Sequence, residues 1–558
     1  MPDGANPASG FASALLGRLV ERGVRHLVVA PGSRSQALAL AAVALERAGL
    51  ATLHVRIDER SAGFLALGLA VESGTPVPVI VTSGTAAANL HPAMLEAWHS
   101  GVPLMALTAD RPAELRGVGA NQSTVQPGIF GPATPWSVDV PAPETAADAD
   151  RAVELADEAW EHAAAGTLRS APVQLNLAFR DPLSGFPGSR SAGPRTPVTV
   201  PVAAAPGARL ADTGATIVVA GSGAGPTAAE FARAAGLPLL AEVASGSRFG
   251  PNLVPAYRQV LADPAFGGRV RQVIVFGRPN LSREVSALLL RSEVSSVVVA
   301  TRGAQQFDPS RRARIVAGLL LPDSPGDRVW LGEWVQAGRR AEQPADDAPY
   351  VGDPAAASPV QAGRLARAEL AAVRAPVTRR SLVEAVWRAS WPHDRLVLGA
   401  SRLIRDADRA VPGKRIPVHA NRGLSGIDGT ISTALGIAIA ATRGDRPMRG
   451  TTRVLLGDLT LLHDVGGLLL PPGETPARVQ VIVGNDGGGT IFDGLEVAAT
   501  ADAASFDRVL YTPQTADFAA LARGFGWAHS VAATRGDLDR ALTSPPQGVS
   551  ILEVPLPR

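Results

Sequence analysis

Two strand ends near the C-terminus carry oxygen donors beside glycine. Gly457-Asp458-Leu459 follows the apolar stretch 452–456, and Asn485-Asp486-Gly487 follows the apolar stretch 479–483. A carboxylate and a carboxamide at neighbouring strand ends are hard oxygen ligands of the kind that Mg²⁺ prefers, and Mg²⁺ commonly holds a phosphate as well. The glycines allow backbone N–H groups to approach an anion closely. On spacing alone, a metal–phosphate site and two ordinary strand-end turns explain this pattern equally well.

A second candidate site is a glycine-serine loop near the N-terminus. The apolar stretch 26–30 runs into Pro31-Gly32-Ser33-Arg34-Ser35, and an alanine- and leucine-rich helix follows. Such a loop presents backbone N–H groups and a helix N-terminus to an anion, and the Arg34 guanidinium adds a fork of donors. We favour an anion site here over a plain strand–helix turn with a surface arginine.

Glu59 also follows a strand, at 53–57, and precedes a helix predicted at 62–71. Asp58 beside it is a suitable N-cap for that helix. The carboxyl ends of parallel strands are where α/β sheets place their sites. By itself, however, Glu59 is better explained as a carboxylate that stabilises the helix dipole and pairs with a nearby arginine.

Further polar and basic residues stand at strand ends or in the loops after them. They are Arg111 after 104–108, Asn121 and Gln122 in the next loop, Ser401 and Arg405 after 395–399, and Arg422 in the glycine-rich loop 419–429. Ser401 and Arg405 are four positions apart, so on a helix they would share one face and could clamp a carboxylate. Arg302 follows 296–300, where a surface role is as plausible as a site role.

The order strand, loop, helix repeats along the chain and predicts parallel, doubly wound α/β sheets. A chain of 558 residues is too long for one hydrophobic core. Two stretches rich in Pro, Ala and other small or polar residues, 186–208 and 340–373, are typical of linkers. We therefore predict three domains, at residues 1–185, 209–340 and 375–558.

Composition excludes several classes of protein. The net charge is only +2 and no Lys/Arg run is interleaved with aromatic residues, which argues against a nucleic-acid-binding protein. There is no cysteine, so disulfides, thiolate metal sites and a cysteine nucleophile are excluded. The N-terminus has no signal-peptide pattern, and the longest apolar run is far short of the roughly 20 residues that span a bilayer. We expect a cytoplasmic protein without a membrane span.

One motif predicts a different kind of binding site. The stretch 221–226 imitates a dinucleotide-binding loop, and Glu242 follows about 20 residues later, as that motif requires. The pattern is short and common, and Pro226 stands where the third glycine or alanine belongs. A non-catalytic nucleotide-binding or regulatory protein is therefore the alternative from a different class.

The segments taken together resemble the thiamine diphosphate enzymes of the decarboxylase and acetolactate synthase type. The matching segments, in the family's order, are 31–35, 58–63, 108–112, 120–122, 421–423, 425–429, 457–459, 462–464 and 491–492. Within that superfamily they are most similar to the branch in menaquinone biosynthesis that joins 2-oxoglutarate to isochorismate with loss of CO₂. Two departures are Gly484, where the family usually has a polar residue, and Gln36-Ala37, which replaces a Ser/Pro pair.

The resemblance implies a pyrimidine-binding, a middle and a diphosphate-binding domain, in that order. It implies that Glu59 hydrogen-bonds the aminopyrimidine ring of thiamine diphosphate and that Ile427 is the apolar residue holding the cofactor bent. The implied cofactor contacts are Glu59, Ser425, Ile427, Gly457, Asp458, Leu459, Asn485 and Gly487. Mg²⁺, or Mn²⁺ in its place, would be held by the Asp458 and Asn485 side chains and the Gly487 carbonyl.

The resemblance also implies a set of substrate contacts: Ser33, Arg34, Arg111, Asn121, Gln122, Ser401, Arg405, Arg422, Ile491 and Phe492. Of these, Arg34, Arg405 and Arg422 would join Glu59 as catalytic residues. Several arginines suit substrates with two carboxylates each and argue against pyruvate, the substrate expected for a nearer alternative such as acetolactate synthase. In this family the site lies between two subunits, so a homodimer is the minimum and a homotetramer is expected.

Overall fold

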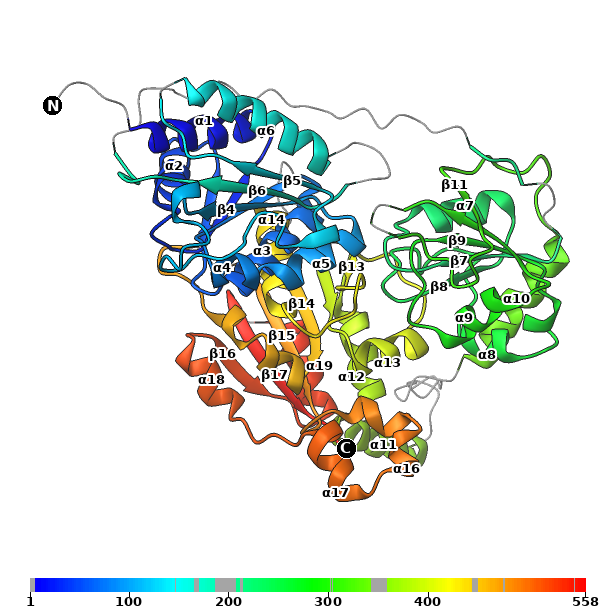
Figure 1. Ribbon diagram of the computed structural model, residues 1–558. Helices are drawn as coiled ribbons and strands as arrows, with labels where there is room; N and C mark the ends of the chain where they lie inside the picture. The colour runs from blue at the N-terminus through cyan, green and yellow to red at the C-terminus, as the bar shows by residue number, and fades with distance from the viewer. Residues whose placement is uncertain are drawn as a thin grey trace.

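The computed structural model describes residues 6–145, 147–164, 170–185, 207–210, 214–301, 303, 305–342, 359–443, 450–474, 477–545 and 547–558. Its strands form three parallel sheets of six, five and six strands, each covered by helices (Figure 1). The predicted fold class is therefore confirmed. Among the described residues, no helix combines the length and the apolar character needed to cross a membrane.

The first sheet carries the N-terminal candidate residues. Its strand order is β2 (Thr52–Val55), β1 (His26–Val29), β3 (Val77–Val81), β4 (Leu104–Asp110), β6 (Val173–Ala178) and β5 (Trp136–Val140). One face packs on α1 (Pro7–Glu21), α2 (Gln36–Arg47) and α6 (Asp148–Ala164). The other face packs on α3 (Glu59–Ser73), α4 (Thr85–Asn89) and α5 (His91–Ser100). The central strands are buried along their whole length, as expected for a sheet covered on both faces.

The second sheet belongs to the middle part of the chain, drawn green in Figure 1. Its order is β11 (Arg314–Val316), β10 (Ser295–Val299), β9 (Gln272–Phe276), β7 (Thr216–Ala220) and β8 (Leu239–Ala241). Its helices are α7 (Thr227–Ala235) on one face and α8 (Tyr257–Ala262), α9 (Arg283–Leu290) and α10 (Arg328–Ala341) on the other. The predicted linker 340–373 is wrong in part, because a helix, α11 (Pro359–Arg374), occupies its second half.

The third sheet carries the C-terminal candidate residues. Its order is β13 (Val418–His419), β12 (Arg395–Leu398), β14 (Thr452–Gly457), β15 (Val479–Asn485), β17 (Val549–Pro555) and β16 (Ala528–Val531). On one face lie α12 (Arg379–Ala389), α13 (Arg402–Ala410) and α19 (Arg535–Thr543), and on the other α14 (Thr430–Arg443), α15 (Asp458–His463) and α18 (Phe518–Gly524). The short helices α16 (Val497–Thr500) and α17 (Ala503–Phe506) follow the β15 loop.

The first and third sheets share one apolar core, which is continuous through α3 and α14. Glycines allow these two helices to approach closely. A Cβ on Gly68 would lie 2.0 Å from the Thr433 carbonyl oxygen, and one on Gly436 would lie 2.2 Å from the Leu65 carbonyl oxygen. The helix that begins at Glu59 is thus fixed against the sheet that bears Asp458.

Substituting Gly68 with alanine is expected to destabilise the protein by about 1–3 kcal/mol, because backbone rather than a flexible side chain blocks the new methyl group. Gly10→Ala in α1 is the matched control, since no heavy atom of the described residues outside its own helix turn lies within 4 Å of its added Cβ. That change should be neutral or stabilising by up to about 1 kcal/mol. Thermal unfolding followed by circular dichroism measures both; equal midpoints for the two variants would contradict the close packing of α3 on α14.

Candidate functional site

The two halves of the predicted metal–phosphate motif lie on neighbouring strands. β14 and β15 pair in parallel with Gly457 opposite Gly484, so both strands end at the same edge of the sheet. Asp458 is the first residue of α15 and is buried, whereas Asn485 is the last residue of β15 and is half-buried. The sheet register therefore brings a carboxylate and a carboxamide together, as the sequence predicts.

Two of the three predicted oxygen ligands of this motif accept hydrogen bonds from the same residue, Gln514. Asp458 Oδ2 accepts a hydrogen bond from Gln514 Nε2 at 3.0 Å, and the Gly487 carbonyl accepts one from Gln514 N at 3.2 Å. Asn485 Nδ2 donates to Glu553 Oε1 at 2.8 Å, which turns the side-chain oxygen of Asn485 toward Gly487 N at 3.3 Å. Gln514 and Glu553 were not anticipated from the sequence, although a lone glutamate in the otherwise apolar end of β17 was a usable signal.

This donor set fits a small divalent cation. Its members are a carboxylate, an amide oxygen and a backbone carbonyl, which are hard oxygen ligands. Burial raises the pKa of Asp458, and the neighbouring charge of Asp486 adds to that rise. The hydrogen-bond donors to the Asp458 carboxylate, Gln514 Nε2 and Leu459 N, are neutral. A bound cation would supply the countercharge that this buried carboxylate lacks among the described residues.

Gly484, the departure noted in the sequence, faces away from this site. A Cβ there would lie 2.9 Å from Leu403 Cδ1 and 2.9 Å from Leu556 Cδ1, in the core beneath α12 and α13. The absence of a side chain at Gly484 therefore affects the packing of the core and not the side of the motif that bears Asp458 and Asn485.

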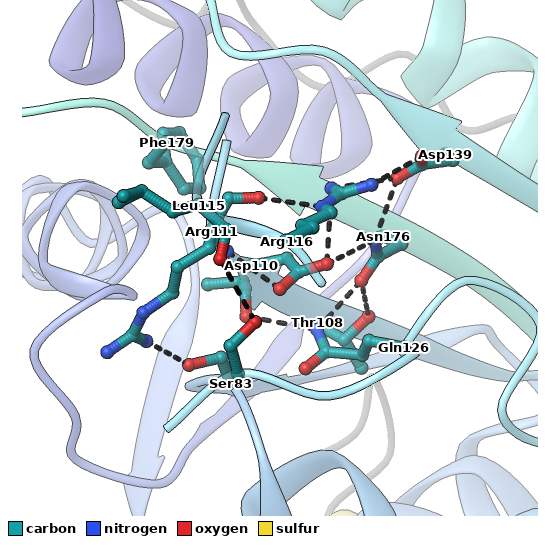
Figure 2. Close-up of polar contacts among 12 residues, drawn as sticks. Ser83, Thr108, Asp110, Arg111, Leu115, Arg116, Gln126, Asp139, Asn176 and Phe179 are labelled. Atoms are coloured by element: carbon teal, nitrogen blue, oxygen red, sulfur yellow. Dashed lines mark hydrogen bonds and ion pairs between the residues drawn. The ribbon is translucent and has the colours of Figure 1, made fainter. Parts of the chain in front are cut away.

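The predicted substrate residues of the first sheet also lie together. Arg34 and Arg111 are buried, and burial, together with the charge of Arg34, lowers the pKa of Arg111. Arg34 donates to the Phe179 carbonyl at 3.0 Å. Arg111 donates to Ser83 Oγ (Figure 2). Ser83 Oγ in turn donates to the Gln122 carbonyl at 2.9 Å. Ser33, which precedes Arg34, and Asn121, which precedes Gln122, are exposed.

Ser401 and Arg405 meet in a way that differs from the prediction. Ser401 is not within the helix but precedes α13, with a φ of 92° that is strained for a residue with a side chain. The Arg405 guanidinium donates to the Ser401 carbonyl, so the two residues still meet. Burial and the positive charges of Arg258, Arg409 and Arg283 lower the pKa of Arg405. Carboxylates offset part of this charge, since Arg258 pairs with Asp408 at 3.0 Å and Arg409 pairs with Asp406 at 3.6 Å. The arginines of this cluster would attract an anionic ligand.

Arg422 is fixed by contacts with both other domains. It is 3% exposed, and its Nη2 donates to Asn280 Oδ1 of the middle part of the chain at 2.6 Å. The next two residues donate their backbone N–H groups to the Glu96 carboxylate of α5, at 2.7 and 2.8 Å. Arg422 Nη1 is buried and has no hydrogen-bond partner among the described residues. Arg422 also lines a cavity of about 820 Å³ where the three sheets' domains meet.

The loop after Arg422 lies on α3. A Cβ on Gly429, whose φ is 60°, would lie 1.9 Å from Phe64 Cγ, so only glycine fits there. Ser425, with a φ of 63°, and Ile427 are half-buried in this loop. Ile491 and Phe492, also half-buried, belong to the short 3₁₀ turn Thr490–Gly494 after the metal motif.

Glu59 lies at the start of α3, and Asp58 is its N-cap, as predicted, because its side chain accepts from Arg60 N. Glu59 is half-buried and its Oε2 accepts from Asn89 Nδ2 at 3.4 Å. Within the described part of the chain, no hydrogen bond or ion pair joins Glu59 to Asp458, Asn485 or Gly487.

The dinucleotide-binding alternative is not supported. Glu242 is 1% exposed, and its Oε1 accepts from the backbone N–H groups of Leu281 and Ser282 at 2.7 and 3.2 Å. This carboxylate therefore holds a loop of its own sheet and is not placed to contact a ribose. Arg302 lies outside the described residues.

Comparison with known proteins identifies the family. Residues 10–129 match the family model for the thiamine pyrophosphate enzyme N-terminal TPP-binding domain. The whole chain is 57% identical to the 2-succinyl-5-enolpyruvyl-6-hydroxy-3-cyclohexene-1-carboxylate synthase of Leifsonia xyli subsp. xyli, with 98% of that protein covered. The whole chain is also 55% identical to the synthase of the same name from Clavibacter michiganensis subsp. michiganensis, of which 97% is covered. A Mycobacterium avium protein of that name is 36% identical over 98% of this chain and 96% of its own length. The chain therefore belongs to the 2-succinyl-5-enolpyruvyl-6-hydroxy-3-cyclohexene-1-carboxylate synthase family of thiamine diphosphate enzymes.

Proposed function

We propose that this chain is a transferase that joins 2-oxoglutarate to isochorismate, with loss of CO₂, in menaquinone biosynthesis. The product would be 2-succinyl-5-enolpyruvyl-6-hydroxy-3-cyclohexene-1-carboxylate. The observation that carries the proposal is the 57% identity, over the whole chain, to a relative named for that product. The clustered arginines of the first and third sheets agree with it, because both substrates carry two carboxylates.

Each of the three sheets belongs to a domain with its own proposed role. Residues 1–185 would bind the pyrimidine end of thiamine diphosphate, residues 375–558 its diphosphate and the metal, and residues 209–340 would form the middle domain. Mg²⁺, or Mn²⁺, would be held by Asp458, Asn485 and the Gly487 carbonyl. Gly457 and Leu459 flank Asp458 in the sequence, and Ser425 and Ile427, in the loop that lies on α3, would contact the cofactor.

Thiamine diphosphate, when bound, supplies a carbon nucleophile and a place for the electrons released when CO₂ leaves a 2-oxo acid. Glu59 would hydrogen-bond the aminopyrimidine ring and promote proton movement there. Its carboxylate suits that role because it is half-buried and, among the described residues, is held only by a long hydrogen bond from Asn89. Burial of a carboxylate in such a site strengthens the hydrogen bonds that it makes.

The arginines would bind and orient the two substrates. Arg34 and Arg111 lie close together at one sheet edge, and Arg405 lies among other positive charges at another. Ser33, Asn121, Gln122 and Ser401 would add polar contacts, and Ile491 and Phe492 apolar ones. Arg422, whose Nη1 lacks a partner among the described residues, would complete the set as a fixed donor.

A homodimer is proposed as the minimum active unit, and a pair of dimers as the assembly. Support comes from the lack of any bond between Glu59 and the metal motif within one described chain. Exposed apolar side chains also lie within three positions of proposed site residues in the sequence, with Ile57 71%, Val125 86% and Leu424 52% exposed. A second copy covering them would bring Glu59 to the partner's metal motif. The cytoplasmic location stays a prediction.

The deciding experiment is incubation of the protein with 2-oxoglutarate, isochorismate, Mg²⁺ and thiamine diphosphate, with the product measured by mass spectrometry. Loss of CO₂ from 2-oxoglutarate but not from pyruvate is expected. CO₂ release from pyruvate would instead favour a decarboxylase or acetolactate synthase activity. Calorimetric binding of NAD without Mg²⁺-dependent binding of thiamine diphosphate would favour the regulatory alternative.

A further inference from the structure

A buried polar network lies under the predicted substrate residues of the first sheet, and the proposed function assigns it no role. Figure 2 shows most of it, and Thr108 and Asn176 are paired neighbours on β4 and β6. Thr108, Asp110, Gln126, Gln174 and Asn176 are all fully buried. Polar groups in such a place are costly unless every one is satisfied, so their arrangement fixes one geometry.

Asp110, the last residue of β4, holds the amide of the residue that follows it. Its Oδ1 accepts from Arg111 N at 2.7 Å, and its Oδ2 accepts from Asn176 Nδ2 at 2.9 Å. Arg116 adds an ion pair to Asp110 Oδ2 at 3.1 Å. One buried carboxylate thus holds the start of the loop that begins at Arg111.

Arg116 holds the backbone carbonyl of Arg111, on the other side from Asp110. Its Nε donates to the Arg111 carbonyl at 2.8 Å, and its Nη1 and Nη2 donate to Asp139 at 2.7 and 3.1 Å. The N–H and the C=O of Arg111 are therefore both held by side chains, one by Asp110 and one by Arg116. Only the planar guanidinium fork of arginine can contact Arg111, Asp110 and Asp139 in three different directions at once.

Asn176 and Gln126 extend the network to the far end of the loop. Asn176 Oδ1 accepts from Thr108 Oγ1 at 3.1 Å and from Gln126 Nε2 at 2.7 Å. Gln126 Oε1 accepts from Gly84 N at 3.1 Å, next to Ser83, which bonds both Arg111 and Gln122. The loop from Arg111 to Gln126 is consequently fixed at both ends.

Core packing alone does not explain why hydrogen bonds hold the loop from Arg111 to Gln126 at both ends. Arg34 and Arg111 are both buried and carry like charges. The carboxylate that pairs with Arg34, Asp181 at 3.6 Å, is exposed and offsets their repulsion only in part, so a fixed backbone helps to keep Arg111 in place. We infer that Asp110 and Arg116 are positioning residues, which keep Arg111 and Gln122 beside Arg34 so that together they bind a carboxylate of one dicarboxylate substrate. The inference rests on the proposed function.

Arg116→Lys is the first test, because lysine keeps the charge but cannot bond Arg111, Asp110 and Asp139 at once. KM for one of the two dicarboxylates should rise about 10- to 100-fold, with kcat within about 3-fold of wild type and thiamine diphosphate binding unchanged. Asp110→Asn should shift the same KM. Arg151→Lys, which alters an exposed ion pair in α6, is the control and should change nothing.

The outcomes separate the inference from the function on which it rests. A wild-type protein that does not turn over the two substrates would refute the proposed function itself. Normal wild-type turnover, with both variants within about 2-fold of wild type in each KM, would overturn the positioning role. A parallel loss of cofactor affinity, kcat and melting temperature would also overturn it, because that pattern marks a structural role only. If Asp110→Asn does not fold, Arg116→Lys decides alone.

Discussion

Replacing Glu59 with glutamine is expected to lower turnover by about 100- to 10,000-fold, the range over which a positioned acid–base group contributes. Glutamine keeps the size and the contact with Asn89, but it removes the carboxylate that would promote proton movement on the cofactor ring. Thiamine diphosphate should therefore still bind, because in the proposed site residues of the third sheet would hold the diphosphate and the metal. The measurements are CO₂ release from 2-oxoglutarate and calorimetric titration with the cofactor.

Glu154→Gln is the matched control for Glu59→Gln. Glu154 is an exposed residue of α6 that pairs with Arg151, and its substitution should leave both measurements unchanged. Retained CO₂ release in Glu59→Gln would remove Glu59 from the proposed role. Loss of cofactor binding together with activity would show that Glu59 holds the cofactor rather than assisting its chemistry.

Replacing Asp458 with asparagine is expected to weaken Mg²⁺-dependent binding of thiamine diphosphate by about 100-fold or more. Substitution of residues that only orient the metal ligands typically weakens metal binding about 10- to 100-fold. Asp458→Asn removes the only charged ligand of the predicted set, so a larger effect is expected. Asparagine preserves the shape and can still accept from Leu459 N, so the fold should hold. Calorimetric titration of the cofactor over a series of Mg²⁺ concentrations measures the effect.

The control for Asp458→Asn is Asp507→Asn, which alters a carboxylate that pairs with Arg558 at the surface. It should bind the cofactor as the wild type does. An unchanged Mg²⁺ dependence in Asp458→Asn would disprove the assignment of Asp458 as a metal ligand. A cofactor that binds equally well with and without Mg²⁺ in the wild type would remove the metal from the site altogether.

The fold class could be predicted because its signals are local. Buried parallel strands appear as continuous apolar runs that end in glycine or a polar residue, and helix caps such as Asp58 depend on only a few neighbouring residues. The edge strands β5 and β16 lack that signal, since they are partly exposed and their burial is uneven. The helix α11 was missed for a related reason, because its alanine- and arginine-rich sequence resembles the composition of the linker before it.

The family, too, could be recognised from the sequence, because short motifs in a fixed order carry it, and the full-length comparison confirms that recognition. The sequence by itself therefore determined the parallel α/β architecture, the family and the identity of the candidate residues. Each of these depends on residue type and spacing along the chain.

The tertiary structure decided which partners orient those residues. Glu553 turns the Asn485 amide, Glu96 and Asn280 fix Arg422, and Asp110 with Arg116 fixes Arg111. It also decided that Gly484 faces the core. These relations join residues that are far apart in the sequence or lie on different faces of a strand, and they arise only when sheet register and domain packing bring the groups within hydrogen-bonding distance.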